Sequence, residues 1–145
     1  MDKPKVMVAL RDLESVESLM TLAIHLWKGM DAELVALHVV EVPAATPMEA
    51  DDEILDHPGR EILAAAARVA EKFSTKLTTI LLRARETGEA IVGEAKDRDA
   101  ELLIVGHRGS HSSVLGELLL GSTAQYVAHH RPCRVIIQIP PPKAG

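Results

Sequence analysis

Aromatic residues are almost missing from this chain, which has one Trp, one Tyr and one Phe among 145 residues. A groove that stacks the bases of single-stranded nucleic acid needs several aromatic faces, so this composition argues against such a groove. A block of Lys or Arg is missing as well, and the formal net charge is −5. Without a basic patch to neutralise a run of phosphates, we expect no nucleic-acid partner.

Cysteine and long apolar runs are equally scarce. The single Cys133 cannot form an internal disulfide, and no apolar signal region opens the chain. No segment reaches the roughly 18 consecutive apolar residues of a membrane-spanning helix. We therefore expect a cytoplasmic protein without membrane insertion. At 145 residues, with 47% hydrophobic content, the chain has the size of one compact domain over 1–145.

Short apolar runs alternate with amphipathic stretches along the chain. The runs predict buried strands at residues 6–10, 34–40, 77–82, 102–105 and 134–139. Helical spacing of apolar residues predicts helices at 15–29, 59–74 and 122–130, and a shorter one around 90–95 that Thr87 could cap. Residues 43–59 are polar and are predicted to form a long, mobile connection.

This alternation predicts a doubly wound α/β fold, with a parallel sheet covered by helices on both faces. In such sheets ligands bind beyond the carboxyl ends of the strands, where the strand order reverses. Arg11-Asp12 and the segment that starts at Gly106 both follow predicted strands. We expect them to share one crevice.

Two glycine segments carry the clearest signal of a site. A predicted strand runs directly into Gly106-His107-Arg108-Gly109, and Gly121-Ser122-Thr123 opens the last predicted helix. Glycine lets a backbone approach a ligand closely, and a helix N-terminus offers N–H groups to an anion. The segments are therefore candidate halves of a phosphate site. A plain turn explains the first equally well, and Ser122 with Gln125 has the spacing of a capping box.

The order of a strand, Gly-x2-Gly, a spacer, Gly-Ser, a helix and Pro-Cys before a terminal strand resembles the universal stress protein family. Val6-Met7-Val8-Ala9 and Leu37-His38-Val39-Val40 agree with its first two strands, so the resemblance covers nearly the whole chain. It implies a five-stranded sheet of order 3-2-1-4-5 and an adenine nucleotide, ATP or AMP, with Mg²⁺ if ATP is bound. The implied nucleotide-binding residues are Asp12, Val39, Val40, Gly106, His107, Arg108, Gly109, Gly121, Ser122 and Thr123.

Two features depart from the family's pattern. Eleven residues, 110–120, separate Gly109 from Gly121, where the family signature has nine. Arg11 stands where the family has its nucleoside-binding Asp, and Asp12 follows one position later. Asp12 takes that role only if the loop is shifted, because neighbouring residues need not point the same way.

The resemblance implies a stress-response or regulatory protein that binds the nucleotide as a signal. We expect little or no hydrolysis, because there is no Walker lysine and no evident carboxylate pair for magnesium and a base. The alternative is a nucleotide-free dimeric module that regulates a partner. The stretch from His38 to Pro43 with Thr46-Pro47 resembles stress-protein domains associated with membrane transporters. Under both hypotheses the resemblance implies a homodimer through Arg134 to Ile139.

The remaining reactive residues favour structural roles. His25 and His38 fall within predicted elements and are expected to be packed or hydrogen-bonded, and Cys133 is expected to be a buried, inert thiol. The acidic residues at 49–53 lack the spacing and the glycine of a calcium loop. No metal ligand set is predicted.

Overall fold

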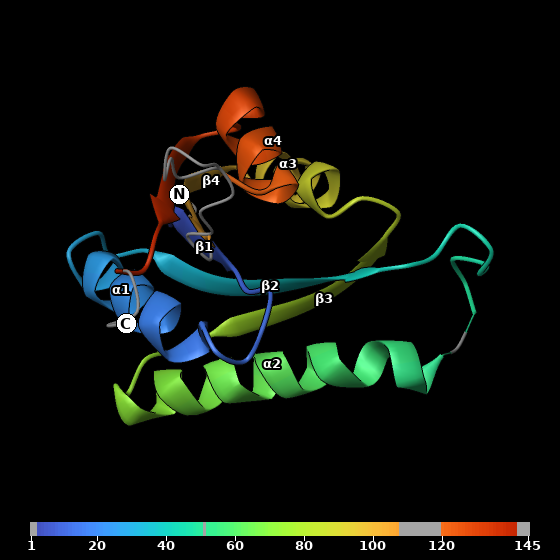
Figure 1. Ribbon diagram of the computed structural model, residues 1–145. Helices are drawn as coiled ribbons and strands as arrows, with labels where there is room; N and C mark the ends of the chain where they lie inside the picture. Colours follow the sequence, from blue (N-terminus) through green and yellow to red (C-terminus); the bar gives the residue numbers. More distant parts are fainter. Residues whose placement is uncertain (1–2, 51, 108–119, 142–145) are drawn as a thin grey trace.

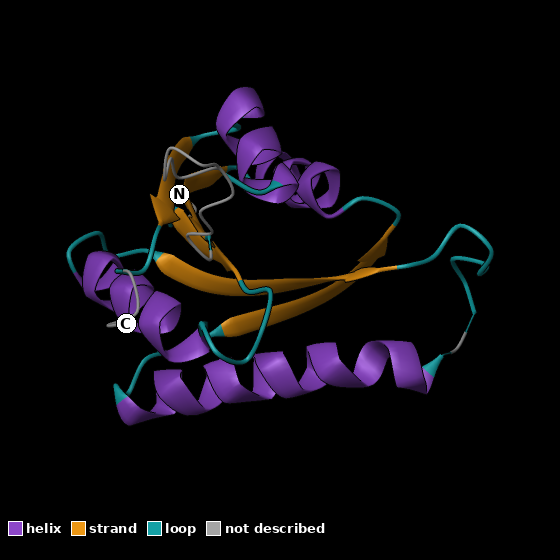
Figure 2. Cartoon of the chain, in the orientation of Figure 1, coloured by secondary structure: helices purple, strands orange, loops and turns teal. Residues whose placement is uncertain are grey.

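The computed structural model describes residues 3–50, 52–107 and 120–141. Its strands form one parallel sheet in the order β3-β2-β1-β4-β5. The strands are β1 (Lys5–Ala9), β2 (Glu33–Glu41), β3 (Thr78–Ala84), β4 (Ala100–Gly106) and β5 (Arg134–Gln138). Helices α1 (Val16–Lys28) and α2 (Glu53–Lys72) cover one face, and α3 (Thr87–Asp97) and α4 (Ser122–His130) cover the other (Figure 1, Figure 2). This arrangement confirms the predicted fold class and strand order.

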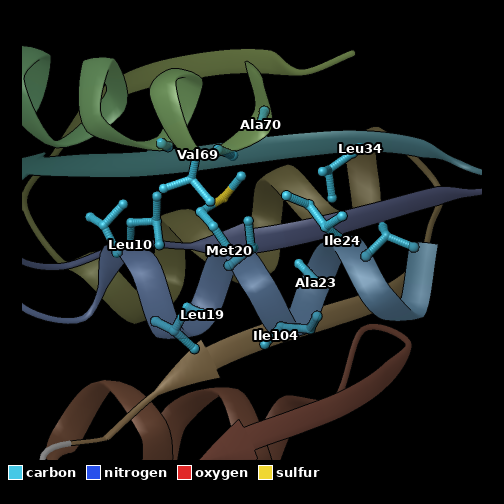
Figure 3. Packing of buried hydrophobic residues seen from close by; sticks show 14 of the residues in the cluster. Leu10, Leu19, Met20, Ala23, Ile24, Leu34, Val69, Ala70 and Ile104 are labelled. Atoms are coloured by element: carbon cyan, nitrogen blue, oxygen red, sulfur yellow. The ribbon is translucent and has the colours of Figure 1, made fainter. Parts of the chain in front are cut away.

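Each face of the sheet carries its own apolar core. Along β1, Val6 and Val8 face α1 and α2, whereas Met7 and Ala9 face α3 and α4. The alternation follows from the period of two that every strand imposes on its side chains. Figure 3 shows the first core, in which Met20 of α1 lies among apolar side chains of the sheet and α2. Because both faces are covered, the buried positions of the central strands β1, β2 and β4 are apolar.

Helix α2 corrects the largest error in the predicted elements. It begins at Glu53 rather than near residue 59, so the polar connection after β2 is shorter than expected. Asp52 caps its start, and the Asp52 carboxylate accepts a hydrogen bond from the Leu55 N–H at 3.1 Å. Pro58 lies inside the helix, where proline normally breaks the pattern. The cap and the contacts of Asp56 described below hold this first part of α2 despite Pro58.

Smaller differences concern the ends of the helices. Thr87 is the first residue of α3 rather than its cap, because Glu86 holds the cap position in extended backbone. Gly29 ends α1, in agreement with the predicted end at residue 29; its N–H donates to the Leu26 carbonyl at 3.3 Å, and the next N–H, of Met30, donates to the Trp27 carbonyl at 3.0 Å. None of the helices in the described ranges combines the length and hydropathy that crossing a bilayer requires.

Candidate functional site

The strand order reverses at β1, which lies between β2 and β4. Ala9 at the end of β1 is in register with Leu37 of β2 on one side and with Val105 of β4 on the other. After β1 the chain enters α1 on one face, whereas the helix that follows β4 is α4 on the opposite face. The carboxyl ends of β1 and β4 are thus the switch point where this class of sheet binds ligands.

Gly106 at the end of β4 is explained by packing. A Cβ at this position would lie 2.9 Å from Leu19 Cδ1, and Leu19 is 1% exposed within the first core. The glycine therefore lets α1 approach the carboxyl end of β4. Arg108 and Gly109, the next two predicted site residues, lie outside the described residues.

His107 connects the two glycine segments. Its backbone N–H donates to the Gln138 carbonyl at 2.9 Å, and its ring Nδ1 accepts the Gly121 N–H at 3.3 Å. Since Nδ1 accepts, the neutral ring carries its proton on Nε2. His107 Nε2 is shielded from solvent and has no hydrogen-bond partner within the described residues. The site thus holds a buried N–H donor that the surrounding protein does not satisfy.

The start of α4 adds further donors. Gly121 is the cap residue, with φ −67° and ψ 168°, and no side chain caps the helix. The predicted capping box is wrong, because Ser122 is already the first helical residue and Gln125 Nε2 donates to the Leu120 carbonyl at 2.6 Å. The first N–H groups of a helix have no partner within it. Those of α4 therefore lie beside the His107 ring and can meet an anion.

Gly121 differs from the other glycines that fix this part of the fold. Among the described residues, a Cβ at Gly121 would meet only the His107 ring, at an ordinary 3.9 Å, and the backbone conformation of Gly121 suits any residue. At Gly88 of α3, by contrast, a Cβ would lie 2.9 Å from Tyr126 Cβ of α4. Close packing of α3 on α4 explains Gly88. Neither sterics nor a positive φ explains Gly121, although glycine is an acceptable cap residue.

At the end of β1, Asp12 is half-buried and Arg11 is exposed. Asp12 Oδ1 accepts the Ser15 N–H at 3.0 Å, and Ser15 Oγ lies 3.3 Å from the Asp12 carbonyl. The carboxylate thereby holds the turn that leads into α1. The structure places Asp12 at the predicted edge of the sheet and shows that it also has a structural partner.

Val39 and Val40 lie near the carboxyl end of β2. They are 8% and 4% exposed, and β2 continues past the point where β1 ends. His38 Nδ1 donates to the Leu10 carbonyl at 2.7 Å, which confirms that this histidine is hydrogen-bonded. On the other side, Val39 and Val40 are in register with Leu82 and Arg83 of β3. On the side of β1, the last residue of β2 in register is Leu37, so Val39 and Val40 lie beyond the end of the β1 pairing.

Two arginines attach the segment after β2 to the end of β3. Arg85 Nη1 donates to the carbonyls of Thr46 at 2.8 Å and Val42 at 3.3 Å, and also to the Pro43 carbonyl. Arg83 Nη1 donates to the Ala50 carbonyl at 2.5 Å. Sequence reasoning did not predict these contacts, because the partners are 33 to 43 residues apart.

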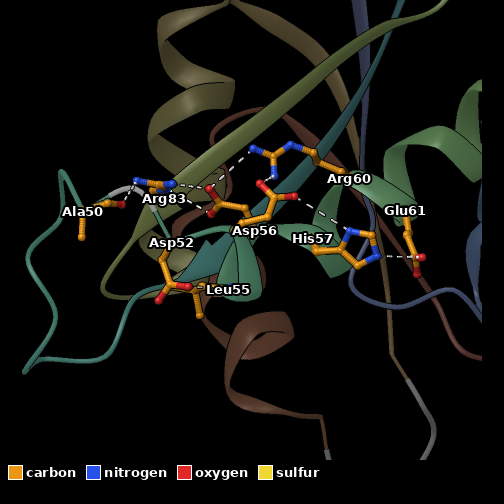
Figure 4. A network of polar contacts seen from close by, with 9 residues as sticks. Ala50, Asp52, Leu55, Asp56, His57, Arg60, Glu61 and Arg83 are labelled. Carbon is orange, nitrogen blue, oxygen red and sulfur yellow. Dashed lines mark hydrogen bonds and ion pairs between the residues drawn. The ribbon is translucent and has the colours of Figure 1, made fainter.

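Arg83 also forms a bidentate ion pair with Asp56 of α2 (Figure 4). Arg83 Nε donates to Asp56 Oδ1 at 3.1 Å, and Nη2 donates to Oδ2. Asp56 is 2% exposed. The hydrogen bond from Arg83 lowers the pKa of the Asp56 carboxyl, burial opposes this effect, and the charges of Arg83 and Arg60 add to the lowering. Asp56 therefore stays ionised and joins α2 to β3.

The other reactive residues contribute no second site. Cys133 is half-buried, and burial together with Glu101 raises the pKa of its thiol, which agrees with an inert cysteine. Within the acidic stretch, Asp52 caps α2 and Glu53 accepts from Arg60 at 2.7 Å. No group of three or more metal-ligating side chains occurs in the described part of the chain.

The fold and the strand order define a doubly wound α/β protein whose strand order reverses at β1. The chain matches the model of the Universal stress protein family over residues 4–138 and belongs to that family. It is 33% identical over 127 residues to a universal stress protein of Methanocaldococcus jannaschii, covering 83% of this chain and 73% of the relative. It is 30% identical over 146 residues to the universal stress protein YxiE of Bacillus subtilis, covering 92% and 97%.

Solved universal stress proteins share the fold at low sequence identity. One from Archaeoglobus fulgidus in complex with dAMP has a TM-score of 0.71 at 19% identity, covering 94% of this chain and 98% of its own. One in complex with cAMP has a TM-score of 0.73 at 22% identity, covering 95% and 98%. One from Arabidopsis thaliana with AMP bound has a TM-score of 0.67 at 18% identity, covering 94% and 91%.

Proposed function

We propose that this protein is a cytoplasmic regulatory protein of the stress response that binds an adenine nucleotide, AMP or ATP, at the carboxyl edge of β1, β2 and β4. The observation that carries the proposal is the buried His107 Nε2, which has no partner within the described residues and lies beside the start of α4. A buried donor without a partner costs about 1–3 kcal/mol, so a ligand acceptor there is favourable. The complexes of similar folds with dAMP, cAMP and AMP support the choice of ligand.

The phosphates would lie at the β4 and α4 end of the crevice. Donors there are the His107 ring and the first N–H groups of α4 at Ser122 and Thr123, and the positive end of the helix dipole favours the anion. Gly121 adds no side chain beside the His107 ring. Arg108 and Gly109 belong to the same proposal and add charge and a further glycine, although they lie outside the described residues.

The nucleoside would lie toward β1 and β2. Asp12 is placed to accept from the ribose hydroxyls, because a carboxylate accepts several hydrogen bonds and can do so while it holds Ser15. The backbone of Val39 and Val40 beyond the end of β1 would pair with the adenine edge. In this proposal Asp12 takes the role of the family's nucleoside-binding Asp.

We propose a binding function with little or no hydrolysis. If ATP is the ligand, Mg²⁺ would be held mainly by phosphate oxygens and water, as this ion prefers. The described residues offer no cluster of three carboxylates, histidines or cysteines that would hold it instead. The nucleotide acts as a signal in this proposal.

Calorimetric titration with AMP and ATP tests the proposal, with Gly121→Ala as the decisive variant. The added methyl meets no clash with the residues that the structure describes, so we expect stability to change by at most about 1 kcal/mol. The same methyl would occupy space next to the phosphates, and we expect nucleotide affinity to fall at least roughly tenfold. The matched control is Gly93→Ala in α3, where a Cβ meets nothing within 4 Å.

Wild-type protein that shows neither heat nor a thermal shift with millimolar AMP or ATP would contradict the proposal. At a concentration 100 times its dissociation constant, a ligand stabilises the folded state by about 2.7 kcal/mol, so binding is readily detected. The nucleotide-free interaction module would then be favoured, with a protein such as a membrane transporter as its partner.

We also propose a homodimer through residues 134–139. Strand β5 lies at the edge of the sheet and pairs with β4 alone in the described residues, and Ile139 just beyond it is 41% exposed. An apolar edge strand invites pairing with another strand. Sedimentation of the wild type and of Ile137→Lys tests this, and a monomeric wild type would contradict it.

A further inference from the structure

The segment that follows β2 is held by one side chain from the neighbouring strand. Arg85, one residue past β3, directs a single nitrogen at the carbonyls of Val42, Pro43 and Thr46. The Val42 N–H donates to the Ala84 carbonyl at 2.8 Å, which extends the pairing of β2 and β3 one residue beyond the end of β2. Residues 42–46 therefore have a defined position although they belong to no helix or strand.

The far end of the same connection is fixed independently. Arg83 donates to the Ala50 carbonyl and pairs with the buried Asp56, as Figure 4 shows. Arg83 is thus needed for the attachment of α2 to the sheet. Arg85 is exposed, and within the described parts of the chain its side chain bonds only to the connection, so its removal would release residues 42–46 alone.

This segment occupies a particular place relative to the crevice. It leaves β2 after Glu41 and lies beyond the carboxyl ends of β2 and β3, past the point where β1 ends opposite Leu37 (Figure 1). Loops in that position form the walls of ligand sites in open α/β sheets. We propose that Arg85 is a positioning residue, which holds residues 42–46 as the wall against which the adenine base packs. The inference rests on the proposed nucleotide function and assigns its base-side specificity to this segment.

The physical reason is preorganisation. A wall that is free to move is in the binding position for only part of the time, and the apparent affinity falls by that fraction. Arg85 has no contact with the base in this proposal. Its removal should therefore weaken binding of the nucleotide by loosening the wall, with the fold intact.

Two measurements on the full chain test the inference. Amide hydrogen exchange on the wild type, with and without AMP, should show that exchange in 42–50 slows when AMP binds. Calorimetric titration with AMP should show roughly tenfold weaker binding for Arg85→Ala and recovery to within about threefold for Arg85→Lys, whose ammonium can still donate to the carbonyls. The control is Arg98→Ala, which removes the same charge. Arg98 lies just before the amino end of β4, at the opposite ends of the strands, and pairs with Glu94 at 2.5 Å.

Each outcome decides the inference. If AMP binds the wild type but leaves exchange in 42–50 unchanged, or if Arg85→Ala binds AMP as the wild type does, Arg85 has only a structural role. If the loss disappears in high salt, screened charge attraction rather than positioning explains it. If the wild type binds no AMP, the proposed function itself is wrong, and the inference about Arg85 is wrong for that reason.

Discussion

The two ends of the proposed crevice satisfy their polar groups in different ways. Beyond β2, the carbonyls of the connection are met by Arg83 and Arg85, so the protein supplies its own partners. Beyond β4, the His107 ring links two segments yet keeps one buried N–H without a partner in the described residues. The connection beyond β2 is therefore held in place by the protein itself. At the β4 end, the His107 Nε2–H remains available to a ligand acceptor. Under the proposal, the unused donor at the β4 end meets the phosphates, whereas the connection beyond β2 is already held in position before a ligand binds.

The largest effect on stability should come from the packing of Leu19 of α1 against Gly106 at the end of β4. Leu19→Ala removes a fully buried side chain and should lower the free energy of unfolding by about 3 kcal/mol, measured by urea titration. Gly106→Ala alone should cost about 1–3 kcal/mol, because the new methyl meets Leu19.

The double variant gives the control for this steric account. In the Leu19→Ala background the methyl at Gly106 has room, so Gly106→Ala should cost less there than in the wild type. Strictly additive costs would show that Leu19 does not dictate glycine at this position. Leu13→Ala, at a residue 52% exposed, should change stability by under about 0.5 kcal/mol.

The next effect concerns the ion pair between Asp56 and Arg83, which joins α2 to β3, and it depends on pH. The pKa of Asp56 is lowered in the folded state, so the ion pair stabilises the protein fully above the ordinary carboxyl pKa of about 4 and loses this contribution as pH falls through the lowered value. Asp56→Asn should therefore be less stable than the wild type near neutral pH, and the difference in urea midpoint should shrink in acid. Arg83→Ala should show the same loss. If the urea midpoints of the variants differ from the wild type by the same amount at every pH, the ion pair does not account for the stability difference.

A moderate effect is expected at the phosphate end. His107→Ala removes the ring that donates through Nε2 and positions Gly121, so AMP affinity should fall roughly tenfold in calorimetry. The control is His130→Ala, at an exposed ring of α4 that stacks on Tyr126 at 3.8 Å. Equal affinities of the two variants would remove His107 from the site.

The smallest effect should come from Ser122→Ala. Ser122 is the first residue of α4 and not its cap, so thermal unfolding should show a loss under about 0.5 kcal/mol, less than the roughly 1 kcal/mol that a capping serine contributes. A loss of a full capping contribution would restore the capping-box interpretation.

The sequence predicted the fold because its periodicities are local. The run 34–40 is apolar at nearly every position, and the buried residues of α1 recur at sequence spacings of three and four. The start of α2 was missed because Pro58 and Gly59 are locally typical of a turn, whereas Asp52 and the distant Arg83 hold the helix. The cap of α4 was wrong by one residue, because the spacing of Ser122 and Gln125 does not say where the helix begins.

The candidate site was predictable only in part. Strand ends and glycines indicate an edge of the sheet, so the positions of Asp12, Gly106 and Gly121 at the crevice were expected. The contacts of Arg83 and Arg85 join residues that are far apart in the chain, and no local pattern reports them. The buried donor of His107 likewise depends on how β4 and α4 meet.

An amide chemical-shift titration of the wild type with AMP tests the central claim most directly. The account predicts shifts concentrated at two places, the amides of His107, Gly121 and Ser122 and those of Val40 and Val42, with little change at Arg98, at the opposite ends of the strands. Shifts confined to other surfaces, or none at millimolar AMP, would contradict it.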